Sequence, residues 1–431
     1  MAASPIKATI FAYQVGFGDC FLLRFDYRRG RPRHVLIDFG TTSLPDSAPK
    51  DQMLRVANDI KAKCADKGDG LDMLVATHRH ADHISGFATN KGAGSGDVIA
   101  ALNPKIIVQP WTEAPDAPLD WLGPEESASK KAFARRRQSL AAMHATAKNA
   151  LAYLAKAGKG VPKAIADQLR FIGEDNLANL SAVRNLQSMA GRHEYVFHGA
   201  ALKSDVELPG ITIDVLGPPT LLQTESIRSQ KSRDKDEFWQ LAPKRLADSV
   251  GLSETEALFP NSPSRAANRM FTEYRWLQRR IDNANADLAL SLVRALDDQM
   301  NNTSVILLMR AGNKTLLFPG DAQLENWQYA LQSPLAALLD QVDVYKVGHH
   351  GSLNATPKSM WNRFKKRGDS KKKDRLQSVM STKHGKHGSD SKNTEVPRRT
   401  LVTALDAESA LHSTEKLATG KLYDEIVIPL T

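Results

Sequence analysis

The sequence predicts an α+β fold, a single domain over 1–431 that is interrupted by two mostly helical insertions. Short apolar runs of strand length recur in the first and last thirds of the chain, and the helical spacing of apolar residues predicts an amphipathic helix at 50–67. Between them the composition changes. The segment at about 112–194 is rich in the strong helix formers Ala, Lys, Arg, Leu and Gln, and the segment at about 221–298 is irregular, charged and helical.

The strands are expected to begin with a hairpin. Two apolar runs at 8–15 and 20–25 are joined by a glycine-containing turn, and a third run at 34–38 ends at Phe39 and Gly40. Further strands are expected at 73–76, 106–108, 195–197, 211–216, 305–309, 315–318, 342–347 and 376–380. We expect the two helical segments to be insertions between these strands rather than a second catalytic domain.

The overall composition predicts a soluble cytoplasmic protein. Of the 431 residues 42% are hydrophobic and 25% charged, and no stretch approaches the roughly 18 apolar residues of a membrane span. The N-terminus has no apolar core of a signal peptide, and two cysteines, Cys20 and Cys64, do not indicate a disulfide framework. The net charge of +10 favours a polyanionic partner such as nucleic acid, although many basic proteins bind none. The oligomeric state is not predicted.

Four side chains of metal-ligand type directly follow a buried strand. The apolar run Met73–Ala76 predicts the strand, and His78, His80, Asp82 and His83 lie within six positions after it. Histidines two positions apart point to the same side of an extended backbone, and the Asp-His pair adds a carboxylate and a third imidazole. Both groups are good ligands for zinc or a similar divalent ion. A histidine-rich surface turn is the alternative, and the concentration of ligands argues against it.

Two later motifs carry the same residue types. A predicted hairpin ends in Pro319-Gly320-Asp321-Ala322, and the strand at 342–347 is followed by Gly348-His349-His350-Gly351-Ser352. Asp321 could also serve only as the cap of a following helix. Gly351 permits close approach of a backbone, and the hydroxyl and amide of Ser352 could hold a phosphate oxygen.

Together these motifs resemble the metallo-β-lactamase superfamily, whose signature H-x-H-x-D-H is matched in full by the residues from His78 to His83. The segments VGFGDCFLL, VLIDFG and GHHGS are most similar to the competence-protein (ComEC-like) branch. The resemblance runs from about residue 6 to 430, apart from the two insertions. It implies an αββα sandwich, with two mixed sheets facing each other, helices outside and the metals at one edge.

The resemblance also implies roles for individual residues. His78 and His80 would hold one metal, and Asp82, His83 and His350 the other. Asp321 would bridge the two metals, because each carboxylate oxygen can serve one cation. Of the two adjacent histidines, His350 is the expected ligand, and His349 would support it or donate a proton to the leaving oxygen. The remaining assignments are Asp38 as a support of the metal loop, Asp82 as a group that also orients the nucleophile, Gly351 and Ser352 as substrate contacts, and Lys383, His384 and His387 as residues at the mouth of the site.

One departure from the superfamily pattern concerns a histidine. Where many members have Gly-His-Thr at the end of a strand, this chain has Gly217-Pro218-Pro219-Thr220. The ComEC-like branch also has proline here, so the departure agrees with that branch. It leaves the first metal site one imidazole short, and His198 is the nearest candidate to replace it.

The chemistry expected of such a centre is hydrolysis. A bound divalent ion lowers the pKa of its water to about 7, and the resulting hydroxide can attack a phosphoryl or carbonyl centre. We expect one or two ions, with zinc favoured and manganese as the alternative, since histidine and carboxylate suit several metals. The leading hypothesis is a metal-dependent phosphodiesterase, above all a nuclease acting on DNA or RNA. The alternatives are a hydrolase of a small phosphoester, cyclic nucleotide or lactone, and a non-catalytic metal-binding scaffold.

Basic clusters leave two interpretations open. They are Lys130-Lys131, 135–137, 230–235, 265–280 and 363–375. The last of these has eight basic residues and two acidic ones and follows the His349-His350 motif, so it could contact a phosphate backbone. The other interpretation of each cluster is a solvated charged loop or helix face.

Overall fold

The protein contains two mixed β-sheets with helices beside them. The computed structural model describes residues 4–65, 70–114, 179–220, 222–224, 301–352, 354–388 and 395–431. Across these residues the first sheet has the strand order β13-β1-β2-β3-β4-β5-β6, and the second has β12-β11-β10-β9-β8-β7. The prediction of a mixed fold of helices and strands is therefore confirmed.

The first sheet combines antiparallel and parallel strands. Strands β13, β1, β2 and β3 pair antiparallel in that order, whereas β3, β4, β5 and β6 run parallel. The strands are β1 (Pro5–Tyr13), β2 (Cys20–Tyr27), β3 (Arg33–Phe39), β4 (Met73–Val75), β5 (Ile106–Pro110), β6 (Arg192–Val196) and β13 (Tyr423–Pro429).

The second sheet repeats this arrangement. Strands β7, β8 and β9 are antiparallel, and β9, β10, β11 and β12 are parallel. They are β7 (Ile211–Gly217), β8 (Ile306–Ala311), β9 (Lys314–Phe318), β10 (Val344–Lys346), β11 (Gln377–Met380) and β12 (Ala410–Ser413). Each sheet thus has an antiparallel half and a parallel half, and the parallel strands end on the same side.

Three hydrophobic clusters define the layers. The central cluster joins inward-facing residues of both sheets, such as Leu23 of β2 and Leu316 of β9. A second cluster packs the other face of the first sheet, including Leu22, against α1, α3 and α6. A third packs the other face of the second sheet against α9, η8, α10 and α11. Successive strand residues point to opposite faces, so both faces of each sheet are apolar and covered.

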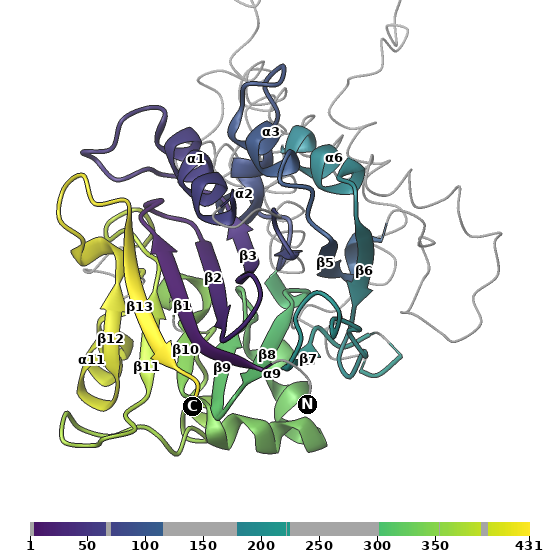
Figure 1. The fold of residues 1–431 in the computed structure, drawn as a ribbon. Coiled ribbons are helices and arrows are strands. Elements are labelled where there is room, and N and C mark those ends of the chain that lie inside the picture. The colour runs from purple at the N-terminus through teal and green to yellow at the C-terminus, as the bar shows by residue number, and fades with distance from the viewer. Residues whose placement is uncertain are drawn as a thin grey trace, which may run out of the picture.

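The helices lie outside the paired sheets. Figure 1 shows α1, α3 and α6 together at the top of the view and α9 at the bottom. The helices are α1 (Gln52–Ala65), α2 (Ala81–Ile84), α3 (Ser95–Ala100), α6 (Leu180–Ser188), α9 (Leu324–Gln332), α10 (Lys358–Trp361) and α11 (Arg399–Glu408). Short 3₁₀ helices are η1 (Ser85–Phe87), η2 (Trp111–Glu113), η8 (Pro334–Gln341), η9 (Gly348–Gly351) and η11 (Thr414–Lys416).

The predicted insertions are described only at their margins. Most of 112–194 and 221–298, with the basic clusters at 130–131, 135–137, 230–235 and 265–280, lies outside the described residues. At the end of the first segment, α6 packs onto the first sheet through Ala182 and Leu186, and β6 begins at Arg192. Strand β13 was not predicted. Its pairing with β1 brings residue 423 opposite residue 13, a long-range contact that no local pattern indicates.

Candidate metal centre

The predicted ligands follow strands that end at one edge of the two sheets. Asp38 lies near the end of β3, the residues from His78 to His83 follow β4, Asp321 follows β9, and His350 follows β10. Because β3 and β4 are parallel in one sheet, and β9 and β10 in the other, their carboxyl ends point the same way. Crevices at the carboxyl ends of such strands are where open α/β sheets bind ligands.

The loop after β4 is anchored to Asp38. The backbone N–H of Thr77 donates to Asp38 Oδ1 at 2.7 Å, and the Thr77 hydroxyl donates to Oδ2 at 2.8 Å. His83 Nδ1 lies 2.8 Å from the same Oδ2. Asp38 therefore contacts the loop in three places. With Asp19 and His83 it also forms a third group whose ligand atoms lie within 4.8 Å of one another, so its role as support rather than ligand stays a prediction. Gly40 permits this packing, since a Cβ there would lie 2.5 Å from the backbone nitrogen of His83.

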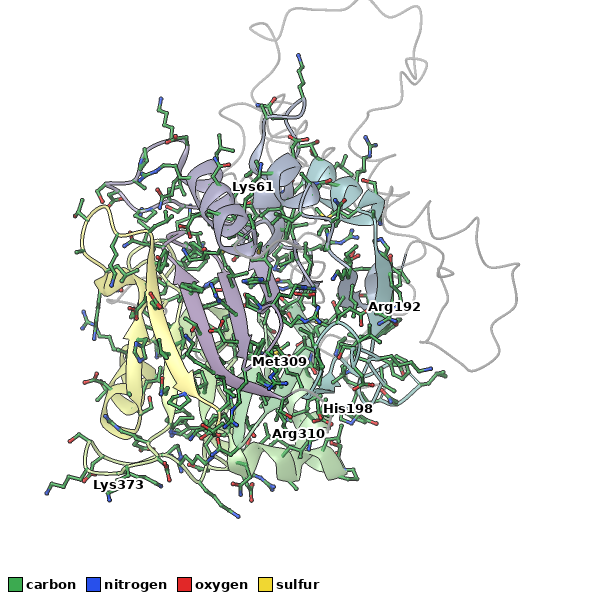
Figure 2. All side chains as sticks on the ribbon, viewed as in Figure 1. Lys61, Arg192, His198, Met309, Arg310 and Lys373 are labelled. Atoms are coloured by element: carbon green, nitrogen blue, oxygen red, sulfur yellow. The ribbon has the colours of Figure 1, made fainter. Side chains whose placement is uncertain are left out.

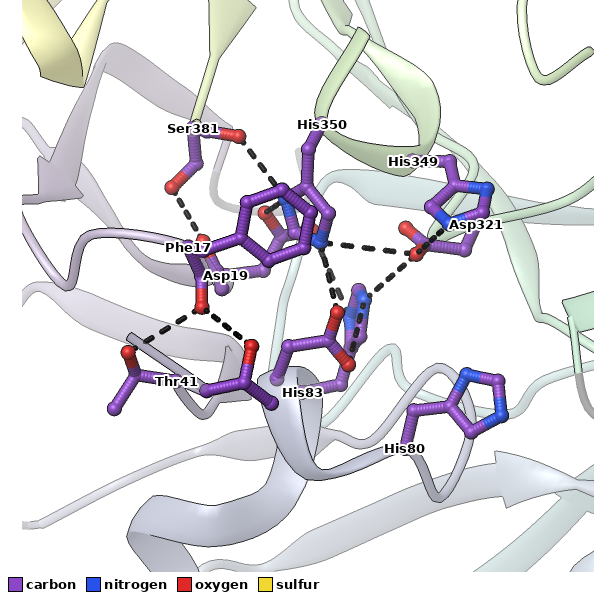
Figure 3. A network of polar contacts seen from close by, with 12 residues as sticks. Phe17, Asp19, Thr41, His80, His83, Asp321, His349, His350 and Ser381 are labelled. Atoms are coloured by element: carbon purple, nitrogen blue, oxygen red, sulfur yellow. Dashed lines mark hydrogen bonds and ion pairs between the residues drawn. The ribbon is translucent and has the colours of Figure 1, made fainter. Parts of the chain in front are cut away.

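Four of the predicted ligands meet in one buried group. Asp82, His83, Asp321 and His350 each have a ligand atom within 4.8 Å of the others. Asp321 Oδ2 lies 3.1 Å from His83 Nε2 and 3.8 Å from His350 Nε2, and Asp82 Oδ2 lies 3.0 Å from His350 Nε2. Figure 3 shows the rings of His83 and His350 pointing toward the Asp321 carboxylate. We call this set the four-residue group.

The second group shares Asp82 with the first. His78, His80 and Asp82 also have ligand atoms within 4.8 Å of one another, and all three are buried. His78 Nε2 lies 3.0 Å from His80 Nδ1, and its Nδ1 lies 3.2 Å from the Thr77 hydroxyl. Burial lowers the pKa of His78 well below its usual value, and the neighbouring His83 and His80 add to the effect. A neutral imidazole is the form that binds metals.

The contacts made by Nδ1 of His83 and of His350 determine where the lone pair of each ring points. His83 Nδ1 faces the Asp38 carboxylate, and His350 Nδ1 faces the carbonyl oxygen of Ser381 at 3.0 Å. Both partners only accept hydrogen bonds, so each Nδ1 must carry the proton. In the neutral ring Nε2 then has a lone pair directed at Asp321 or Asp82, where two acceptors would face each other. A divalent ion between them, or a second proton on each ring, resolves that repulsion.

Several polar atoms of the centre are buried without a hydrogen-bond partner among the described residues. They are both oxygens of Asp321, Asp82 Oδ1 and His83 Nε2. Burial of an uncompensated carboxylate is costly, and metal coordination is one of the ways in which proteins compensate it. The donor set of imidazole and carboxylate matches the ligands of zinc, so the residues present fit a divalent ion.

The electrostatics couple the acids to the imidazoles. Burial opposes the charge on Asp321, but His83, His349 and His350 outweigh it and hold the pKa of that carboxyl well below its usual range. Burial likewise opposes protonation of His83, and the carboxylates of Asp321, Asp38 and Asp82 reverse this and raise its pKa. The pKa of His350 is raised in the same way, chiefly by Asp321 and Asp19. Asp321 and Asp82, whose carboxyl pKa values are lowered, are thus ionised and attract cations.

The two adjacent histidines occupy different environments. His350 is fully buried and belongs to the four-residue group, whereas the His349 side chain is 26% exposed and its Nε2 lies 3.7 Å from Asp321 Oδ2. Both residues adopt left-handed backbone angles, with φ of 44° and 52°. Both rings approach the same oxygen of Asp321, since His350 Nε2 lies 3.8 Å from Oδ2. The sequence alone does not reveal this backbone conformation.

The predicted substrate contacts are only partly brought together. Ser352 is buried, and its amide donates to the His349 carbonyl at 2.8 Å, so the amide is already used. Gly351 has φ of 85° and its carbonyl accepts from Arg398 N–H. The ring of His387 packs edge-on against Phe17, whose ring also lies 4.3 Å from that of His350. Burial lowers the pKa of His387 to about 4.

Lys383, also predicted at the mouth, is held by the loop after β3. Its ammonium donates to the carbonyl of Leu44 at 2.8 Å and pairs with Asp46 at 2.6 Å. The neighbouring His384 is exposed. His198, the suggested replacement ligand, instead places Nδ1 2.8 Å from the Leu216 carbonyl and packs against Tyr329. It belongs to none of the candidate groups among the described residues.

The basic loop at 363–375 is not at the centre. Arg363 and Lys365 pair with Asp340, Lys366 pairs with Asp343, and Arg367 pairs with Glu408. The loop leads into the amino end of β11, whereas the ligands follow carboxyl ends. In Figure 2 Lys373 lies at the lower left, while α2 lies near the top of the same view in Figure 1. The suggested phosphate contact beside the metals does not match this placement.

Sequence reasoning missed two features of the centre. Lys346, at the end of β10, is buried with its ammonium on the carboxylate of Asp19, which follows the turn between β1 and β2. Burial opposes the charge on Lys346, but Asp19 and Asp321 raise its pKa, so it is an ammonium. Arg79, between the first two histidines of the motif, forms a buried pair with Glu113 at 2.8 Å. The sequence signal that could have found them was a charged residue in an unusual place: Lys346 in an apolar strand, and Arg79 inside the histidine motif.

Comparison with known proteins assigns no family. A scan against protein-family models finds none that matches the chain, and a search of the curated proteins finds no similar sequence. Among the described residues, no helix combines the length and the apolar character needed to cross a bilayer.

Proposed function

We propose that this protein is a metal-dependent hydrolase of phosphodiesters, with the backbone of DNA or RNA as the first candidate substrate. The observation that carries the proposal is the shared position of Asp82. It joins the three-residue group of His78, His80 and Asp82 to the four-residue group, so that two sets of buried ligands form one continuous centre. The resemblance of the motifs to the metallo-β-lactamase superfamily and its ComEC-like branch supports this proposal.

The arrangement of the sheets agrees with the same proposal. Two mixed sheets pack face to face with helices on their outer faces, which is compatible with an αββα metallo-β-lactamase sandwich. The ligands come from both sheets, and Asp321 in one sheet faces His83 in the other. Six buried residues of ligand type gathered in two adjoining groups argue against a non-catalytic scaffold, which has no need of so many ligands.

When bound, a divalent ion supplies Lewis acidity and activates water at neutral pH. His78, His80, Asp82, His83, Asp321 and His350 would hold it. We assign Asp82 the orientation of an attacking water, a role supported by its Oδ1, which has no hydrogen-bond partner among the described residues. His349 is partly exposed beside Asp321, and we assign it the transfer of a proton to the leaving oxygen.

A second candidate, hydrolysis of a small phosphodiester such as a cyclic nucleotide, is favoured by one observation. Four of the eight basic residues in the loop at 363–375 pair with Asp340, Asp343 or Glu408, away from the centre. The net charge of +10 still favours an anionic substrate. Salt separates the two candidates, because contacts to a phosphate backbone weaken steeply with ionic strength and contacts to a small ester do not.

The test is hydrolysis of bis-p-nitrophenyl phosphate and of linear single- and double-stranded DNA and RNA, with zinc or manganese. His80→Ala and Asp321→Ala should abolish turnover, and Asp214→Asn should not, because Asp214 pairs with Arg310 on the surface of β7 and β8. Polymer cleavage that both ligand variants remove would support the nuclease. Cleavage of the small diester alone would support the second candidate, and no activity in metal-loaded protein would overturn both.

A further inference from the structure

Lys346 is a buried cation at the base of the candidate metal centre. Its side chain is 2% exposed, and the ammonium contacts the Asp19 carboxylate, the Gly320 carbonyl at 3.2 Å and Asp321 Oδ1 at 3.6 Å. Lysine is rarely buried to this extent without paired acids. These partners place a permanent positive charge directly against one of the proposed metal ligands.

Asp19 lies behind both imidazoles of the four-residue group. Asp19 Oδ2 is 3.7 Å from His83 Nδ1, and Oδ1 is 3.5 Å from His350 Nδ1. The Asp19 amide donates to the carbonyl of Asp82 at 2.8 Å, which ties it to the ligand loop. Asp19 therefore faces the outer nitrogens of the two rings, opposite the Nε2 atoms that face Asp82 and Asp321.

Lys346 also divides the roles of the two Asp321 oxygens. Oδ1 faces the ammonium, whereas Oδ2 faces His83 Nε2 at 3.1 Å, His349 Nε2 at 3.7 Å and His350 Nε2 at 3.8 Å. The sequence-based expectation gave one oxygen to each of two cations. Oδ2 is the oxygen that would be left to hold a metal ion, because Oδ1 faces Lys346.

We infer that Lys346 and Asp19 form one positioning unit, which orients Asp321, His83 and His350 toward a common metal-binding point. The inference rests on the metal-binding part of the proposed function. Groups that hold metal ligands in place commonly contribute 10- to 100-fold to metal affinity. Lys346 would act in this way although its own charge repels a divalent ion.

Because charge repulsion and positioning by Lys346 act on metal affinity in opposite directions, the direction of the change in affinity distinguishes them. If Lys346 only neutralises acids, Lys346→Met makes the centre more negative and strengthens binding of a divalent ion. If Lys346 positions Asp321 and Asp19, the same change lets both carboxylates move, and affinity falls. The two accounts predict opposite directions for one measurement.

The experiment is calorimetric titration of metal-free full-length protein with Zn²⁺ and with Co²⁺, with visible absorption of the Co²⁺ form as a report of ligand geometry. We expect Lys346→Met and Asp19→Asn each to lower affinity about 10- to 100-fold and to alter the Co²⁺ spectrum. The double variant should lose no more than the worse single variant, because the two residues act as a unit. Lys346→Gln also removes the positive charge, so it repeats the test of direction if Lys346→Met does not fold.

Lys314→Met is the matched control. Lys314 also pairs with a buried acid, Asp343, at 3.1 Å, but it lies at the amino end of β9, away from the ligands. Its variant should bind metal as the wild type does. Unchanged or higher affinity in Lys346→Met or Asp19→Asn would overturn the inference alone. Metal binding without hydrolysis would overturn only the proposed function, and a wild type that binds no divalent ion would overturn both.

Discussion

The two ends of strand β4 both carry buried acids, and they differ in what surrounds them. At the amino end, Asp72 is enclosed by donors: Arg31 lies 2.9 Å away, Arg33 3.3 Å, Lys105 3.5 Å, and the His34 amide donates at 3.0 Å. These groups outweigh burial and lower the pKa of Asp72. Every partner there can donate, so the acid is satisfied within the fold.

At the carboxyl end, the acids face imidazoles whose other nitrogens are already used. The pKa of Asp321 is also lowered, but its oxygens have no hydrogen-bond partner among the described residues. Burial and a lowered pKa are therefore common to both ends and do not identify a functional site. The kind of partner differs. Asp72 is surrounded by guanidinium and ammonium groups, which keep their protons, whereas Asp321 faces three imidazoles, which can exchange their protons for a divalent ion.

The largest expected effect is on metal affinity at the carboxyl end. Asp321→Asn removes a negative charge that three imidazoles face, so we expect metal affinity to fall by at least about 100-fold, the upper end of what supporting groups contribute. Calorimetry with Zn²⁺ measures it. Circular dichroism checks that the variant is folded, because Asp321 also faces the ammonium of Lys346. Affinity within a few-fold of wild type would remove Asp321 from the ligand set.

The opposite end should respond in stability rather than in binding. Asp72→Asn leaves Arg31 and Arg33 without their acid, and since these side chains are partly exposed we expect a loss of about 3 kcal/mol in the free energy of unfolding. Urea denaturation checks this, with metal affinity as the control. An Asp72 variant that lost metal affinity as Asp321→Asn does would show that the two ends are not separate.

A smaller effect is expected from pH. In metal-free protein the raised pKa values of His83 and His350 stabilise the fold below pH about 6.5, and this contribution is lost as pH rises through the raised values. Bound metal replaces those protons, so the increase in Tm caused by Zn²⁺ should grow from about pH 6 to pH 9. Differential scanning of both forms measures it.

Asp321→Asn serves as the control for the pH experiment. Asp321 is the largest favourable influence on the pKa of both imidazoles, so the metal-free variant should lose most of the pH dependence above pH 6.5. An increase in Tm by Zn²⁺ that shrinks as pH rises would contradict the assignment of these rings as ligands.

The smallest effect is expected at the basic loop. Lys371 and Lys373 are exposed and lie beyond the amino end of β11, so replacing both with alanine should change metal affinity and hydrolysis of bis-p-nitrophenyl phosphate by less than about two-fold. A large loss of small-diester turnover would show that this loop reaches the centre. A loss confined to polymer substrates would indicate a remote contact with the backbone.

The sequence predicts most of the fold and the ligand residues because both depend on local patterns. Apolar runs indicated strands within a few residues of β2, β4 and β9, and six ligand-type side chains stood in compact motifs. The pairing of β13 with β1 and the Lys346–Asp19 pair were missed because each is a contact between residues more than 300 positions apart. The apolar run at the centre of β13 was itself overlooked. The suggested phosphate contact of the basic loop at 363–375 was based on its nearness to His350 along the chain. The fold separates the two in space.

The central claim is that the buried acids and imidazoles at the carboxyl end of β4 bind a divalent ion. Anomalous diffraction at the zinc absorption edge, from crystals of the full-length protein grown with Zn²⁺, tests it most directly. The account predicts a peak at about 2.0–2.2 Å from His350 Nε2 and from an oxygen of Asp321 or Asp82. A peak only at surface residues, or none in zinc-containing crystals, would contradict it.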